Sequence, residues 1–210
     1  MTFQNGALQR AETLPETGNS LIKVVSLSKG TSELCLHELG EYFGFEYSPR
    51  LHYLHESSLR NYFHWGLDSD ASLMNTLPQS SVSESLCLGR IHPHVYLKEI
   101  GEVKGINVGY GVFATMPIPC NEFIGEYVGV VMESSTAVTS CSYSLNYPSA
   151  DKSFVISAKE IGNLIRFVNH SPSPNASFQP FISEGIVHVL CVSDLRSSCF
   201  ANSSGVGNNS

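Results

Sequence analysis

Positive charge is scarce in this sequence. Twelve Lys and Arg residues stand against 19 Asp and Glu residues, and the net charge is −7. A protein that binds nucleic acid directly needs a basic surface to neutralise phosphates. The composition therefore argues against direct nucleic-acid binding, and it suits a basic partner such as a Lys-rich protein tail.

Paired cysteines and long apolar runs are also missing. The six Cys residues form no C-x-x-C pair, which disfavours a zinc ribbon or a thioredoxin-like motif. A chain of this length needs no disulfides to fold, so we expect reduced thiols. No run approaches the ~20 apolar residues of a membrane span, and the N-terminus lacks the layout of a signal peptide. We expect a soluble protein without membrane contact.

The histidines that are present occur in patterns that make poor metal sites. His52, His55 and His64 fall within a predicted helix, and His92 and His94 fall near a predicted strand. Neither set has a matching third ligand, which a zinc site requires. We predict packing or surface roles for them, and no metal site.

The sequence predicts a mainly helical region over residues 21–92. Residues 1–20 are polar and predict a flexible tail. The run 21–28 predicts a short strand, and Thr31 or Ser32 then caps a predicted helix. A second helix is predicted over 51–67, and the Ser-rich residues 68–86 predict a linker.

From about residue 93 the pattern becomes β-rich, with short runs of β-branched and aromatic residues between Gly, Pro and Asn. One helix is predicted here, starting at Ser157, whose spacing to Glu160 matches a capping box. A helical part followed by a β-rich part defines an α+β protein.

The run 109-GYGVFA-114 matches the dinucleotide-binding pattern G-x-G-x-x-G/A. That motif requires a helix directly after the glycines. Pro117 and Pro119 would fall in its first turns, where proline costs ~3 kcal/mol or more. We therefore predict a strand–turn–strand element around Gly109 and Gly111. It is either a cofactor loop of another kind, because glycine lets a ligand approach the backbone, or a hairpin turn without a ligand.

The run 166-RFVNHSPSPN-175 places polar side chains directly beside apolar ones. A buried polar cluster needs hydrogen-bond partners, and a polar ligand could supply them. The segment alone fits a ligand site and a structural loop equally well.

Taken together, these runs resemble the SET domain, the fold of protein-lysine methyltransferases that use S-adenosylmethionine. The matching runs are, in chain order, 109-GYGVFA-114, 126-EYVG-129, 143-YSLN-146 and 166-RFVNHSPSPN-175. The resemblance implies an α+β fold of several small curved β-sheets with a knot-like C-terminal part over residues 93–195. A mainly helical region, 21–92, would precede it, and residues 196–210 would form a disordered tail.

The resemblance also implies S-adenosylmethionine as the cofactor and a lysine of a basic, histone-like protein as the substrate. It implies that Tyr127 is the catalytic residue and faces the lysine channel. It implies a cofactor site made of Gly109, Tyr110, Gly111, Tyr143, Arg166, Phe167, Asn169 and His170.

The C-terminal end departs from the family. The closing motif, an acidic pair followed by L-x-x-D-Y, is replaced by 194-DLRSSCFANSSGVG-207, and no tyrosine follows Tyr147. The same fold could therefore serve as a binding module without turnover. As a small stand-alone SET protein, this chain resembles those of some intracellular bacteria. That resemblance implies a cytoplasmic protein, or a nuclear one after delivery to a host cell. The aromatic residues of the N-terminal helices could also pair in a homodimer.

Overall fold

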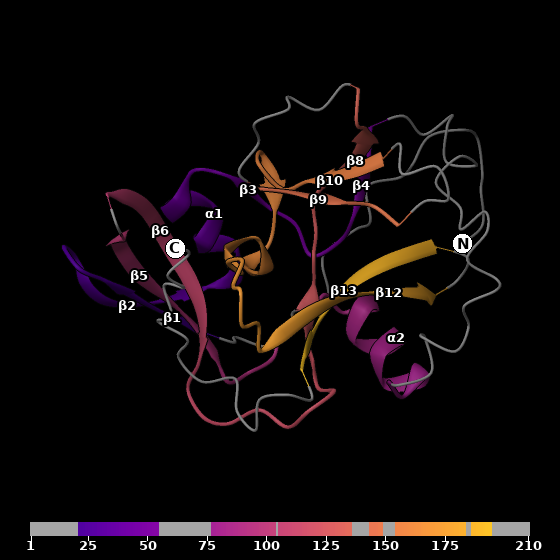
Figure 1. The fold of residues 1–210 in the computed structure, drawn as a ribbon, viewed down its shortest axis with the longest axis horizontal. Coiled ribbons are helices and arrows are strands. Elements are labelled where there is room, and N and C mark those ends of the chain that lie inside the picture. The colour runs from indigo at the N-terminus through magenta and orange to yellow at the C-terminus, as the bar shows by residue number, and fades with distance from the viewer. Residues whose placement is uncertain are drawn as a thin grey trace.

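The computed structural model describes residues 21–54, 77–103, 105–135, 143–148, 154–183 and 186–194. Within these residues the fold is mostly β, with four small sheets, two short α-helices and one 3₁₀ helix (Figure 1). The expected α+β protein with a helical N-terminal region is thus corrected to a mainly β protein. The expected knot-like threading stays a prediction, and the two predicted tails lie outside the described residues.

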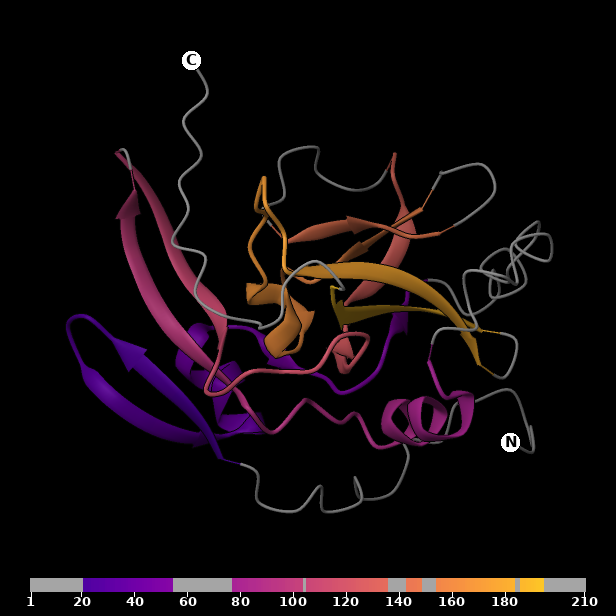
Figure 2. The ribbon, with the colours of Figure 1, turned by 60° about the horizontal axis from the view of Figure 1, so that its bottom comes forward.

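The first sheet has the strand order β2-β1-β5-β6 and forms a long curved ribbon (Figure 2). Its strands are β1 (Leu21–Ser26), β2 (Gly30–Cys35), β5 (Val95–Val103) and β6 (Ile106–Ala114). Ile22 and Val24 alternate with more exposed residues along β1, and Leu97 of the parallel neighbour β5 is fully buried. This period of two is what places one face of the sheet on the core.

The other sheets are shorter. One has the order β4-β8-β10-β9, one pairs β11 with β3, and one has the order β12-β13-β7. Their bounds are β3 (Glu46–Tyr47), β4 (His52–Tyr53), β7 (Phe123–Glu126), β8 (Val130–Glu133), β9 (Ser144–Asn146), β10 (Phe154–Ser157), β11 (Ile161–Gly162), β12 (Ala176–Ser183) and β13 (Ile186–Ser193). Strands β1, β3 and β4 each pair in parallel with a later strand, so the N-terminal segment contributes strands to three of the sheets.

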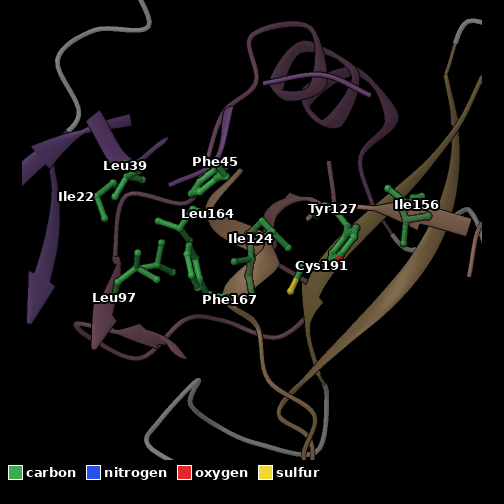
Figure 3. Close-up of a cluster of buried hydrophobic side chains, with 14 of the residues drawn as sticks. Ile22, Leu39, Phe45, Leu97, Ile124, Tyr127, Ile156, Leu164, Phe167 and Cys191 are labelled. Carbon is green, nitrogen blue, oxygen red and sulfur yellow. The ribbon is translucent and has the colours of Figure 1, made fainter. Parts of the chain in front are cut away.

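One continuous core joins these sheets. It runs from Ile22 and Leu97 on the first sheet, through Phe45 and Leu164, to Ile156 on the second sheet (Figure 3). A smaller cluster lies under helix α2 (Gln79–Cys87) and contains Val82, Leu86, Phe181, Leu190 and Val192.

The first predicted helix begins later than its capping signal suggested. Gly30, with φ of +77°, closes a tight β1–β2 hairpin, and Thr31 and Ser32 pair with β1 instead of capping. Helix α1 spans Leu36–Phe43 and ends at Gly44, whose φ is +73°. The glycine conformations decide both boundaries, because only glycine adopts them without strain.

Two further expectations for this region are also corrected. His52 and Tyr53, the start of the predicted second helix, form strand β4 against Val130 and Val131, and the remainder from residue 55 lies outside the described residues. The Ser-rich segment expected to be a linker contains α2. Tertiary burial of its apolar side chains outweighs the weak helix propensity of serine.

The helix expected from Ser157 is replaced by two different elements. Ser157 ends β10, and the 3₁₀ helix η3 (Leu164–Phe167) begins only after strand β11. The Asn163 side chain accepts a hydrogen bond from the Ile165 amide and donates one to the Glu126 carbonyl, 2.9 Å away. Pairing with neighbouring strands and this cap therefore outweigh the helical spacing of the apolar residues.

Candidate active site

The two glycines of the 109-GYGVFA-114 run lie inside one strand, β6, which corrects the expected strand–turn–strand arrangement. The hairpin turn falls earlier, at Gly105, between the paired residues Val103 and Ile106. The β5–β6 register shifts beside Gly101, which pairs with Gly109, and both have positive φ. A bulge of this kind kinks the strand and re-aims its side chains.

Gly111 lies in a cradle formed by the ends of neighbouring side chains, which a Cβ at this position would displace. A Cβ at this position would lie 2.9 Å from Ile100 Cδ1 and 3.1 Å from Asn169 Nδ2. The same Asn169 amide donates a hydrogen bond to the Tyr110 carbonyl, at 3.0 Å. The structure therefore brings together the two sequence runs that suggested a ligand, although they are about 60 residues apart.

A cleft of about 110 Å³ opens at this junction. Its volume is below the ~300–1,000 Å³ that is usual for small-molecule sites, so it would receive only part of a nucleoside-sized ligand. Asn169 and His170 lie exposed at its edge, and Gly111 is buried. The lining residues are Ile100, Gly111, Val112, Phe113, Val168, Asn169, His170, Ser171, Pro174, Asn175 and Ala176.

Arg166 is buried beside the cleft-lining segment and is surrounded by aromatic rings. Its guanidinium carbon lies 4.0 Å from the centre of the Tyr143 ring, 4.2 Å from that of Phe45 and 5.5 Å from that of Phe167. Its Nε and Nη1 atoms are buried and have no hydrogen-bond partner. Burial lowers the pKa of Arg166, and neighbouring Tyr143 opposes this shift.

Such an arrangement is costly unless something compensates it. Cation–π contacts supply part of the stabilisation, about 0.5–2 kcal/mol each. Buried donors without a partner cost about 1–3 kcal/mol each. Arg166 is therefore suited to receive an acceptor, and an anionic one would also balance its charge.

The wall behind Arg166 comes from residues that sequence reasoning did not assign to the site. Phe43, at the end of α1, makes edge or tilted contacts with Tyr110 and Phe167, with both pairs of ring centres 4.8 Å apart. Phe45 follows the αL glycine that ends α1. The sequence showed the aromatic character of both residues and a helical spacing for Phe43, and those features indicate core packing rather than a site.

Glu99 anchors the other side of Tyr110. Its Oε2 accepts hydrogen bonds from the Ser26 hydroxyl and the Leu27 amide, both at 2.7 Å, and from the Tyr110 hydroxyl at 3.4 Å. The Ser26 hydrogen bond, followed by the Leu27 amide, lowers the pKa of Glu99. The β1–β2 hairpin thus helps to hold the bulged strand.

Tyr127, the expected catalytic residue, is buried next to the carboxyl end of β7. Its ring meets that of Phe178 edge to face, with centres 5.5 Å apart, and its proximity opposes the lowering of the Arg166 pKa by burial. Phe178 was not predicted as a site residue. Glu126, directly before Tyr127, pairs with His188 across to β13 at 2.6 Å.

Comparison with known proteins agrees with this geometry. Residues 109–197 match the model of the SET domain. The Arabidopsis thaliana protein SUVH5, named a histone-lysine N-methyltransferase specific for H3 lysine 9, is 34% identical over 92 residues, which cover 42% of this chain and 12% of SUVH5. The histone-lysine N-methyltransferase Su(var)3-9 of Drosophila melanogaster is 28% identical over 161 residues, which cover 71% of this chain and 23% of that protein.

The fold is also shared with a solved structure, that of Arabidopsis thaliana SUVH6 in complex with SAM. The TM-score is 0.52 at 18% identity, and the match covers 86% of this chain and 47% of the SUVH6 chain. The SET-domain match covers residues 109–197, a little under half of the chain. Three of its matched curated relatives are named histone-lysine N-methyltransferases, one of them as putative, and the chain spans about a third or less of their length.

The relatives described above come from a plant and an insect, so the likeness to small bacterial members stays a prediction. Within the described residues, no helix has the length and apolar character needed to cross a bilayer.

Proposed function

We propose that this protein binds S-adenosylmethionine at the junction of β6 with residues 166–176 and methylates lysine side chains of histone-type proteins. The observation that carries the proposal is the Asn169–Tyr110 hydrogen bond beside a buried Arg166 whose Nε and Nη1 donors lack partners. This hydrogen bond joins the two SET-domain runs next to the Arg166 guanidinium, whose unpaired donors suit an anionic ligand group.

The residues present fit the cofactor. S-adenosylmethionine carries a carboxylate, for which the unpartnered Nε and Nη1 atoms of Arg166 are suitable donors. Gly111 lets the ligand approach the backbone of β6, because no Cβ fills the cradle. The exposed Asn169 and His170 offer hydrogen-bonding groups at the rim of the cleft. When bound, the cofactor would supply an electrophilic methyl group on a sulfonium.

The chain's own residues would prepare the lysine. A free lysine has a pKa of about 10.4, so its ammonium must lose a proton before the nitrogen can attack. The buried rings of Tyr127 and Phe178 would desolvate the ammonium, and the nearby charge of Arg166 would repel it. Both effects lower the pKa of the amine. The Tyr127 hydroxyl would then orient the nitrogen lone pair, a gain of proximity and alignment.

A histone H3 tail is the substrate that we propose first. SUVH5, the relative at 34% identity, carries H3 lysine-9 specificity in its name. The net charge of −7 favours association with a basic tail. Radiolabelled methyl transfer to core histones, followed by Lys-to-Arg substitution in the H3 tail, tests this choice.

Replacing Asn169 with Ala should weaken binding of S-adenosylmethionine. The change removes the hydrogen bond to the Tyr110 carbonyl and one polar group at the rim, worth about 1.5–3 kcal/mol, or roughly 10- to 150-fold in Kd. Isothermal titration calorimetry measures the effect. Ser81→Ala on α2 is the control, since that hydroxyl bonds only within its own helix region. No binding by the unmodified protein, or equal binding by Asn169→Ala, would refute the cofactor assignment.

Replacing Tyr127 with Phe should slow methyl transfer and leave cofactor affinity almost unchanged. The ring stays against Phe178, whereas the hydroxyl proposed to orient the amine is lost. The loss of one positioned group typically costs 10²–10⁴-fold when it takes part in the proton transfer itself and less when it only aligns the amine, so we expect a decrease of about tenfold or more. Rates and product methylation states that match those of the unmodified protein would exclude this role.

A cofactor-binding module without turnover is the second candidate. It is favoured by the run 194-DLRSSCFANSSGVG-207, which lacks the family's closing tyrosine. Cofactor binding that depends on Asn169, together with no methyl transfer to any histone, would select this alternative. Restored transfer after grafting an E-E-L-x-x-D-Y ending would then identify the missing group.

A further inference from the structure

A group of three metal-ligating side chains lies at the start of α1, outside the proposed catalytic site. Cys35, His37 and Glu38 each offer one ligand atom, and these atoms all lie within 4.8 Å of one another. Among the residues that the structure describes, no other three His, Cys, Asp or Glu side chains are grouped in this way. Cys35 belongs to no C-x-x-C pair, so cysteine spacing gave no sign of this group.

The spacing of one ligand pair matches a tetrahedral ion, and the Glu38 carboxylate, within 4.8 Å, would complete the set after a small movement. Cys35 Sγ and His37 Nε2 are 3.5 Å apart. Zinc bonds of ~2.3 Å to sulfur and ~2.0–2.1 Å to nitrogen, at the tetrahedral angle, place these two atoms ~3.5 Å apart. The pair is therefore already spaced as two ligands of one zinc ion would be.

The ordinary explanation for this group is helix capping, and it accounts for only part of the arrangement. Cys35 occupies the N-cap, its sulfur accepts from the Glu38 amide, and Glu38 Oε2 accepts from the Cys35 amide at 2.8 Å. Cysteine is not a preferred N-cap residue, for which Ser, Thr, Asp and Asn are favoured. The imidazole of His37, which is in hydrogen-bond contact with the sulfur, lies outside the capping pattern, and a carboxylate has a second oxygen for a cation.

The local sequence is acidic after Lys29, whose ammonium lies over the Tyr42 ring towards the other end of α1. Residues 30–43 contain three Glu residues, at 33, 38 and 41, and no Lys or Arg. The partial positive charge at the start of α1 opposes a cation, but a thiolate and a carboxylate bring two full negative charges to the same place. A thiolate and an imidazole select zinc-like ions over magnesium or calcium, which prefer oxygen ligands.

We propose that Cys35, His37 and Glu38 bind one zinc-class divalent ion, with a water or another group in the fourth position. On binding, the Cys35 thiol loses its proton to solvent and the thiolate ligates the ion. The site lies at the opposite end of α1 from Phe43, which packs on Tyr110 and Phe167. Ion binding would thus stabilise the helix that supports the candidate active site. This inference does not depend on the proposed methyl transfer.

Equilibrium dialysis of the reduced, tag-free chain against Zn²⁺ in a competing chelator tests the site. We expect one ion per chain, and Co²⁺ in its place should give the intense near-ultraviolet absorption of a cobalt–thiolate bond. The double variant Cys35→Ser/Glu38→Gln keeps a capping box of the S-x-x-Q type, so α1 is retained while two ligands are lost. Its affinity should fall by at least about 100-fold, because even outer-shell changes cost ~10–100-fold.

Two more variants complete the test. His37→Gln should also weaken binding, whereas Cys87→Ser, which removes an exposed thiol at the end of α2, should not. Zinc at 100 times its Kd should raise the Tm of the unmodified chain by roughly 5–10 °C and leave that of the double variant unchanged. No stoichiometric binding, or equal binding by the double variant, would overturn the proposal, and neither result depends on S-adenosylmethionine or on activity.

Discussion

Replacing Arg166 with Met should abolish most of the affinity for S-adenosylmethionine while leaving the ligand-free protein as stable as before, or more stable. Most buried arginines would not behave in this way, because losing them breaks an ion pair. Here the guanidinium forms no ion pair within the described residues, and its Nε and Nη1 donors have no partner.

The physical reason is that the desolvation cost of the buried guanidinium is fully offset only when an anionic ligand is bound. Replacement of buried charge by an apolar side chain of similar volume is often neutral or stabilising, by ~1–4 kcal/mol. Loss of cation–π contacts with Tyr143 and Phe45 reduces this gain. Truncating one partner of a buried charge pair costs about 2–5 kcal/mol in binding, or roughly 30-fold to several thousand-fold in Kd.

Thermal unfolding without ligand and calorimetry with S-adenosylmethionine measure the two sides of this prediction. Arg166→Lys is the matched control. It keeps the charge but loses the planar group that stacks between rings, so its affinity should be intermediate. Unchanged affinity in Arg166→Met would show that the cofactor's anionic group is bound elsewhere, and a large drop in the Tm of the ligand-free protein would show that the arginine is mainly structural.

Replacing Phe45 with Ala should destabilise the whole protein, although this residue lies outside the part that matches the SET-domain model. Phe45 is 8% exposed, covers Arg166 and meets Phe167 at 6.2 Å between ring centres. Truncation of a buried Phe to Ala typically costs ~3–5 kcal/mol. For a chain of this length that corresponds to a Tm lowered by about 6–20 °C.

Cofactor affinity should fall in the same variant, since the cavity would let Arg166 move out of its cage. Phe45→Leu should recover most of the stability. Tyr96→Ala, on the outer face of the first sheet over Lys23, should cost no more than about 1–2 kcal/mol. Circular dichroism in the far and near ultraviolet follows the transition. If residues 21–54 formed a separate unit, Phe45→Ala would leave the main transition unchanged, which would contradict the prediction.

Several features of the site could be predicted from the sequence because they depend on residue type at short range. The glycines of β6 and the run from Arg166 to Asn175 were recognised from their order and spacing. The structure confirms that they meet, through Asn169 and the Tyr110 carbonyl. Proline at 117 and 119 correctly excluded a helix after Gly111, because its ring and missing amide act within a single turn.

Other features could not be predicted because they depend on partners distant in the chain. The apolar spacing after Ser157 is helical, but Glu46 and Tyr47 pair with Ile161 and Gly162 and make them a strand. The same applies to the segment at His52, which pairs with Val130. In both cases a parallel neighbour more than 70 residues away supplies the backbone hydrogen bonds that a helix would otherwise make locally.

The sequence by itself determined the likeness to the SET domain, the two runs that meet at the candidate site, and the excess of acidic over basic residues, since all three follow from residue identity and order. Only the tertiary structure decided that Phe43 and Phe45 close the site and that Arg166 is buried with its Nε and Nη1 donors unpaired. It also placed Cys35, His37 and Glu38 within reach of one ion. Burial and the distances between side chains arise when separate segments pack together, and no local pattern encodes them.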